Sequence, residues 1–216
     1  MNVLDSRFLR QGDCFVHHFS TEGTLRYQLS LLAVSLAAHD DDEPSQTVVV
    51  GAGSSTVQRQ HNVTVRRVDG ELVADPAQLE IAKGDLVLWS GDASAVFGFR
   101  VRGRFGDEVI DSAALRNGSV YTHAFGLPGH YAWVDANGSG VRGQIDVAAP
   151  DPADFDQERW MRSLEEGTLV TVKGKRATPA SVKVRVGQTV VWAVQSAPGV
   201  SITDASLLTN NRQKGE

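Results

Sequence analysis

The chain has a single cysteine, Cys14, among 216 residues, and it has no long apolar run. One thiol cannot form a disulfide within the chain, so the fold does not depend on crosslinks. No stretch approaches the ~20 apolar residues that cross a membrane, so we expect no membrane span. Residues 1–25 also lack the charged and then apolar pattern of a secretory signal peptide.

The composition also lacks a strong excess of one charge. The formal net charge is −5, and no cluster of basic residues gives the electrostatic footprint of a nucleic-acid-binding protein. With 41% hydrophobic and 22% charged residues, the sequence is that of an ordinary globular protein. Its length allows one large domain or two small ones.

Common catalytic motifs are missing as well. No Gly-x-Ser-x-Gly elbow is present, which argues against the usual hydrolase nucleophile. Gly51 and Gly53 precede serines and no lysine, so they do not form a phosphate-binding loop. We therefore predict that the protein is not an enzyme and that it uses no cofactor.

What the sequence does contain is a repeat. Residues 5–27 and 111–133 share the pattern Asp-Ser-x-x-Leu-Arg-x-Gly, followed by a histidine and a phenylalanine, and the copies lie 106 positions apart. Residues 79–89 match residues 182–192, and here the copies lie 103 positions apart. A repeat of this length usually determines the architecture.

The order of the matching segments predicts two domains. One complete domain is expected at 61–147, and a second is expected to combine 166–216 with 1–36, split across the termini by circular permutation or strand exchange. Residues 37–60 and 148–165 are then linkers, the first acidic and the second helical. In the second linker, Asp151 is expected to cap a helix whose apolar side chains pack on a neighbouring domain: Phe155, Trp160, Met161 and Leu164.

Alternating apolar and polar residues predict β-strands almost throughout. Residues 79–88 and 182–190 have this two-residue period, and glycine-containing turns separate the segments. Short strands at regular spacing favour a sandwich. The predicted fold class is all-β, with two Greek-key β-sandwiches joined by the two linkers.

The central segment resembles a cupredoxin, the small copper-binding sandwich of plastocyanin, amicyanin and halocyanin. The resemblance lies in Leu79-x-Ile81-x-x-Gly84-Asp85-x-Val87-x-Trp89, Tyr121-x-His123-x-Phe125-x-x-x-Gly129-x-Tyr131-x-Trp133 and Gly143-x-Ile145-x-Val147. It implies that the packing aromatic residues form the cores: Phe19, Tyr27, Trp89, Phe125, Trp133 and Trp192.

The resemblance also places the copper ligands of the family, and none of them is present. In the central unit the ligand positions fall at Phe97, Asp135, Gly138 and Val141. In the split unit they fall near Val200, Leu29 and Leu32. A blue copper centre needs a thiolate and two imidazoles. The resemblance therefore implies the fold without the electron-transfer activity.

Several residues remain as weaker candidates. Cys14, His17 and His18 have metal-like spacing, but in a strand Cys14 and His18 face one side while His17 faces the other, which favours a structural role. Arg100, Arg102 and Arg104 alternate on one strand, either as an anion-contacting surface or as an ordinary exposed face. Asn62, Asn117 and Asn137 stand in Asn-x-Ser/Thr sequons, which are either glycosylation sites or simple turn chemistry.

Closure of the split domain has two alternatives. Residues 166–216 and 1–36 pair within one chain, or the halves exchange head to tail between chains and give rings or filaments. Together these observations predict a copper-free, cupredoxin-like structural or interaction protein with protein partners or self-association. We expect a larger assembly that is extracellular, periplasmic or on the cell surface. The alternative is an electron-transfer or copper-binding protein with a non-standard site.

Overall fold

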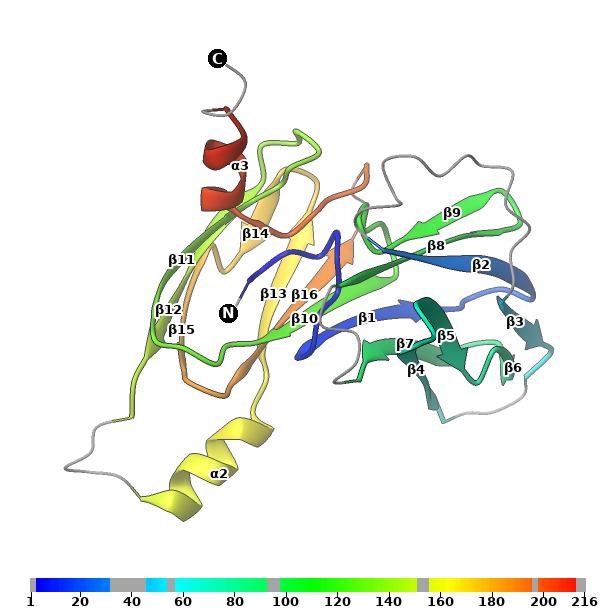
Figure 1. The fold of residues 1–216 in the computed structure, drawn as a ribbon, viewed down its shortest axis with the longest axis horizontal. Helices are drawn as coiled ribbons and strands as arrows, with labels where there is room; N and C mark the ends of the chain where they lie inside the picture. The colour runs from blue at the N-terminus through cyan, green and yellow to red at the C-terminus, as the bar shows by residue number, and fades with distance from the viewer. Residues whose placement is uncertain are drawn as a thin grey trace.

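The computed structural model describes residues 3–31, 46–53, 57–92, 98–150, 156–195 and 198–212. Strands dominate these residues, and they form two β-sandwiches that share one continuous eight-stranded sheet (Figure 1). The predicted all-β sandwich class is confirmed. No helix within these ranges is long and apolar enough to cross a membrane.

The first sandwich is built from nine strands. They are β1 (Asp13–His18), β2 (Gly23–Leu31), β3 (Gln46–Gly51), β4 (Gln60–Val68), β5 (Glu71–Asp75), β6 (Gln78–Ala82), β7 (Leu86–Gly91), β8 (Phe99–Phe105) and β9 (Glu108–Asp111). One layer has the order β1-β7-β4-β5 and the other β6-β3-β2-β8-β9. The ring of Tyr27 on β2 contacts that of Trp89 on β7, so the apolar faces of the two layers meet.

The second sandwich follows in the chain. Its elements are β10 (Ser119–Ala124), β11 (Gly129–Val134), β12 (Arg142–Ala148), α2 (Gln157–Glu165), β13 (Thr168–Lys173), β14 (Arg176–Thr178), β15 (Ser181–Arg185), β16 (Thr189–Gln195), β17 (Thr203–Asp204) and α3 (Ala205–Arg212). Its layers are β14-β13-β16-β10 and β15-β12-β11-β17. Trp133 on β11 contacts Trp192 on β16 across the core.

The same pairing pattern occurs in both sandwiches. In the first, β4 is parallel to β7 and β3 is parallel to β6. In the second, β13 is parallel to β16 and β12 is parallel to β15. Val63 lies opposite Trp89 just as Val170 lies opposite Trp192, so the register also agrees.

The grouping of strands into domains differs from the predicted one. β1 pairs with β7, and β2 pairs with β3 and β8, so β1 and β2 complete the sandwich of residues 60–111. β10 instead pairs with β16, and β12 pairs with β15. The predicted domain 61–147 and the predicted split domain are therefore wrong. The predicted linker 37–60 also contains β3, because Gln46-Thr47-Val48-Val49-Val50 is a β-branched alternating segment that pairs with β2.

The two sandwiches join at a seam between β1 and β10. These strands pair antiparallel at the centre of the shared sheet, with Phe15 opposite Tyr121. Asp13 lies opposite His123 and His17 lies opposite Ser119. Because Ser119 and His123 are the repeat counterparts of Asp13 and His17, the seam has approximate two-fold symmetry, and pairing leaves neither strand as an open edge.

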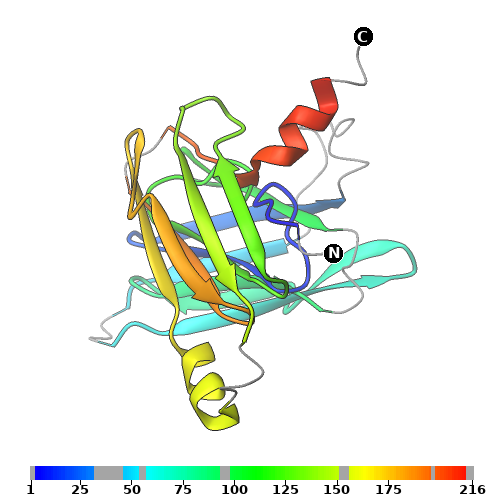
Figure 2. The same ribbon diagram turned by 90° about the vertical axis from the view of Figure 1, so that its left-hand side faces the viewer.

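Two crossing segments tie the sandwiches together beside the seam. The amide of Ser6 donates to Ile202 of the second sandwich, whereas Leu9 pairs with Phe99 of the first. In the repeat copy, Ser112 pairs with Val101 of the first sandwich, and Leu115 pairs with Val200 of the second. In both crossing segments, the repeated Asp-Ser-x-x-Leu motif is thus where the chain passes from one sandwich to the other. The first crossing segment also reaches the start of α3, because the amide of Asp204 donates to the carbonyl of Leu4 at 2.8 Å (Figure 2).

The predicted core aromatics are confirmed, and all of them are buried: Phe19, Tyr27, Trp89, Phe125, Trp133 and Trp192. The predicted helical linker is present as α2, where Trp160 donates its indole N–H to the carbonyl of Val186 at 3.3 Å and Leu164 lies against Gly187. Met161 is 53% exposed, so its predicted packing is wrong. Asp151 and Phe155, and the acidic residues 40–43, lie outside the described residues.

Candidate functional site: a groove at the crossing segments

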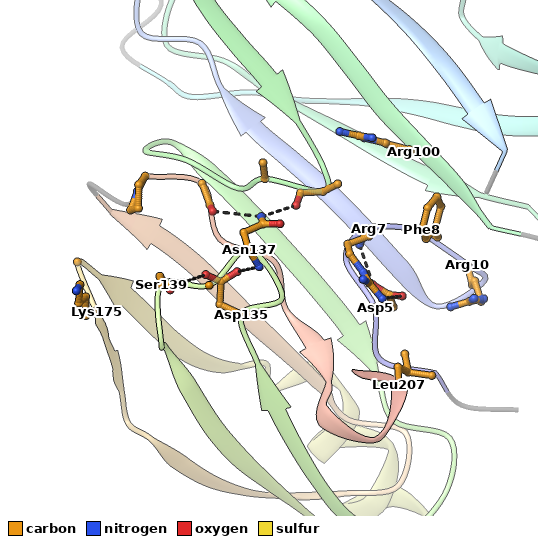
Figure 3. Close-up of a pocket in the computed structure, with 16 residues that line it drawn as sticks. Asp5, Arg7, Phe8, Arg10, Arg100, Asp135, Asn137, Ser139, Lys175 and Leu207 are labelled. Carbon is orange, nitrogen blue, oxygen red and sulfur yellow. Dashed lines mark hydrogen bonds and ion pairs between the residues drawn. The ribbon is translucent and has the colours of Figure 1, made fainter. Parts of the chain in front are cut away.

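A groove of about 1230 Å³ opens where the crossing segments meet the loop end of the second sandwich (Figure 3). Both crossing segments contribute to it, and so do the β11–β12 loop, the β13–β14 turn and α3. Its lining residues are Asp5, Arg7, Phe8, Arg10, Arg100, Ala113, Ala114, Asp135, Asn137, Gly138, Ser139, Gly174, Lys175, Pro198, Gly199 and Leu207.

A difference between the two repeat copies opens the groove. The first crossing segment carries Arg7 and Phe8, whereas the second has Ala113 and Ala114 at the same places. Ala114 packs closely against Gly199, since a Cβ added to Gly199 would lie 3.3 Å from the Cβ of Ala114. Small side chains on this crossing leave room that the bulkier pair of the first copy would fill.

The floor of the groove is organised by Asp135. One carboxylate oxygen accepts hydrogen bonds from the amides of Asn137 and Ser201, at 2.9 and 2.8 Å, and the other accepts from the amide of Ser139 at 2.8 Å. Burial alone would raise the pKa of Asp135, but hydrogen bonds from Ser139, Ser201 and Asn137 outweigh it and lower the pKa below its usual value. Asp135 therefore acts as an ionised anchor for the loop.

Asn137 connects three segments around the groove. Its side-chain amide donates to the carbonyl of Ala113 at 3.0 Å and to that of Gly199 at 3.2 Å. Both amide hydrogens are used, and this nitrogen is the atom to which a glycan would be attached. The geometry favours the turn-chemistry interpretation of this sequon. Asn62 on β4 and Asn117 before β10 are exposed, and both stay predicted glycosylation sites.

The groove lies where the family resemblance places a copper centre, and the residues do not fit copper. Asp135 is saturated by amide donors, Gly138 has no side chain, and Val141 and Val200 are buried apolar residues. No thiolate or imidazole is among them. Leu29 of the first sandwich lies half-buried on β2. Leu32 and Phe97 lie outside the described residues.

Basic groups surround the groove. Arg7 pairs with Asp5 at 2.8 Å, and the Nε of Arg100 donates to Asp111 at 2.8 Å. The Nη1 atom of Arg10 is buried and has no hydrogen-bond partner within the described part of the chain. Lys175 is exposed at the opposite end of the groove from Arg10 (Figure 3).

The weak metal candidates lie at the seam and do not converge. Cys14 and His18 are half-exposed on one face of β1, while His17 is buried on the other, as strand geometry predicts. Across the described ranges, no group of three or more His, Cys, Asp or Glu side chains is arranged to hold a metal ion. Burial raises the pKa of the Cys14 thiol, which disfavours the thiolate that binds metals.

Sequence reasoning missed a buried polar cluster at the seam. Asp13 accepts hydrogen bonds from the hydroxyl of Tyr121 at 2.8 Å and from Nδ1 of His123 at 2.5 Å. At the symmetric position, Nδ1 of His17 lies 3.3 Å from the hydroxyl of Ser119. Burial lowers the pKa of His17 to about 4. The signal was present in the repeat, because Asp13 is replaced by Ser119 in the second copy.

The groove was also missed, although Ala113 and Ala114 in place of Arg7 and Phe8 marked it. Arg100 was identified within the alternating arginines of β8, and the structure places it on the groove wall. Comparison of this chain with protein-family models, with curated proteins and with solved structures finds no match.

Proposed function

We propose that this chain is a copper-free, cupredoxin-like interaction protein, a subunit of a larger assembly outside the cytoplasm. Its two sandwiches are copies of one ancestral unit, and the groove at the crossing segments receives a partner. The observation that carries this proposal is the β11–β12 loop. Where the family places copper ligands, Asp135 fastens the loop through backbone amides and leaves an open groove above it.

The β11–β12 loop, held by hydrogen bonds to Asp135, suits binding better than redox chemistry. Loops held rigidly by a scaffold commonly form recognition surfaces, because little conformational freedom is lost on binding. The Asp135 network and the two Asn137 bonds provide such rigidity. Electron transfer would instead require a bound metal with soft ligands, and the described lining of the groove contains no cysteine, methionine or histidine.

Copper titration tests this proposal. Copper is added to the purified chain, as Cu(I) and as Cu(II), and the visible spectrum and the bound copper after dialysis are recorded. We expect no intense thiolate-to-copper band and no stoichiometric copper retention. A Cys14→Ser variant shows whether any such band arises from this thiol. An intense band that disappears in Cys14→Ser would refute the copper-free assignment.

A further inference from the structure

We infer that the groove binds an extended acidic segment of a partner protein, and that Arg10 is the main anchor for one of its carboxylates. This inference deepens the proposed function and rests on it. Three features support it: a nitrogen of Arg10 without an acceptor, the basic residues along the groove and the apolar side chains in its lining.

Arg10 supplies a donor that lacks an acceptor. Its Nη1 is buried, and no described residue accepts a hydrogen bond from it. The two carboxylates of the same repeat copy have other partners. Asp5 pairs with Arg7, and Asp13 accepts a hydrogen bond from the backbone amide of Arg10. A guanidinium nitrogen without an acceptor is costly to bury, so a ligand carboxylate gains a charge-assisted hydrogen bond when the Arg10 side chain turns this nitrogen toward the groove.

The distribution of charge favours an anion of some length. Arg10 and Lys175 lie at opposite ends of the groove (Figure 3), so one small anion cannot contact both. The only described carboxylates that line the groove are Asp5 and Asp135, which are held by Arg7 and by backbone amides respectively. The excess charge of the lining is therefore positive, although the chain as a whole carries −5. This contrast gives charge complementarity to an acidic partner.

Apolar side chains also line the groove, which suits a peptide. Phe8, Leu207 and Pro198 line it, together with the small residues of the second crossing. A peptide that carries carboxylates at both ends and apolar residues between them can contact both basic side chains and the apolar part of the lining. A compact anion such as phosphate matches only one end.

The test uses the full chain and a synthetic peptide. The probe is an acetylated and amidated peptide, Glu-Glu-Ser-Leu-Val-Ser-Glu-Glu, and the comparison peptide has Gln in place of each Glu. Isothermal titration calorimetry measures both at low and at moderate salt. We expect saturable binding of the Glu peptide only, weakened by salt because the exposed part of the attraction is screened.

Variants locate the site. Arg10→Gln is expected to weaken binding about 10-fold or more, since it removes a buried charge-assisted contact. Lys175→Gln is expected to weaken it about 2- to 5-fold, as for an exposed ion pair. Lys83→Gln, at the exposed β6–β7 turn away from the groove, is the matched control and is expected to change affinity less than about 2-fold.

A steric variant makes the test independent of charge. Ala114→Phe introduces the residue that the first copy carries as Phe8, so it is expected to fill the groove and abolish peptide binding. Thermal unfolding verifies that each variant is folded, and Arg10→Lys provides a second variant should Arg10→Gln not fold.

Equal binding of both peptides refutes the inference. So does an Arg10→Gln effect no larger than that of Lys83→Gln, or inorganic phosphate binding as tightly as the Glu peptide. These results leave the copper titration unchanged, so failure of the inference is distinguishable from failure of the proposed function.

Discussion

Replacing Asp13 with serine should strongly destabilise the protein, because Asp13 is the buried acceptor at the seam. Its side chain is fully buried and accepts from Tyr121, from His123 and from the amide of Arg10. The shorter serine hydroxyl cannot accept from all three donors, so the variant leaves buried donors without a partner. Removing one member of a buried pair costs about 3–5 kcal/mol. We expect Asp13→Ser to lower the free energy of unfolding by about that amount.

The second repeat copy provides the control. Ser119 is the counterpart of Asp13, and its hydroxyl has one long contact, at 3.3 Å, with His17. Ser119→Ala removes one neutral hydrogen bond and should cost about 1 kcal/mol. Both variants lie on the same seam, in the same strand context, so the difference between them isolates the hydrogen bonds that Asp13 accepts.

Denaturant unfolding followed by tryptophan fluorescence measures both values, since Trp89 and Trp192 lie in the two cores next to the seam. A double-mutant cycle with His123→Gln should show a coupling energy of about 1–3 kcal/mol. Equal costs for Asp13→Ser and Ser119→Ala, or a coupling energy near zero, would contradict the assignment of the cluster as a stabilising feature of the seam.

Three further outcomes can be checked. Burial lowers the pKa of His17 to about 4 from 6.5, so between these values only the unfolded chain takes up a proton. The free energy of unfolding should thus fall by about 3 kcal/mol from pH 7 to pH 4. The fall should be smaller in His17→Gln, and urea titration at each pH measures it in both proteins. Gly103→Ala should cost about 1–3 kcal/mol, because its Cβ would lie 2.4 Å from the carbonyl oxygen of Arg26. Gly126→Ala, with no atom within 4 Å of the added Cβ, should be tolerated, and equal melting temperatures would contradict this reasoning. Asn137→Ala should weaken peptide binding while costing only about 1 kcal/mol of stability, because its bonds position the groove at an exposed site; unchanged affinity would show that the groove does not depend on them.

Local patterns in the sequence were sufficient for several features. The two-residue period predicted the strands, and the shared aromatic positions predicted the core. Successive side chains of a strand point to opposite faces, so burial of one face produces an alternating pattern in the sequence. The opposite orientations of Cys14 and His17 followed from the same geometry. The exposed side chain of Met161 was not predictable, because which side of α2 meets the β-sheet depends on how the helix docks.

The candidate site was harder to predict from the sequence. The groove combines residues from both ends of the chain, such as Arg10 and Lys175, which no local pattern connects. Differences between repeat copies were the available signal. The two copies differ at Ala114, which corresponds to Phe8, and at Ser119, which corresponds to Asp13. The first difference lies at the groove and the second at the buried polar cluster of the seam.

By itself the sequence determined that the chain is a β protein and that its segments recur in alternating order. It did not determine which halves combine. The segment 119–148 lies between 60–91 and 168–195, and its apolar face can be buried against either one with the same alternation. Only the tertiary structure decided this, by pairing β1 with β7 and β10 with β16. The physical reason is that pairing between distant strands depends on the total burial and hydrogen bonding of the whole sheet, including the shared seam and the two crossings, and not on any one segment.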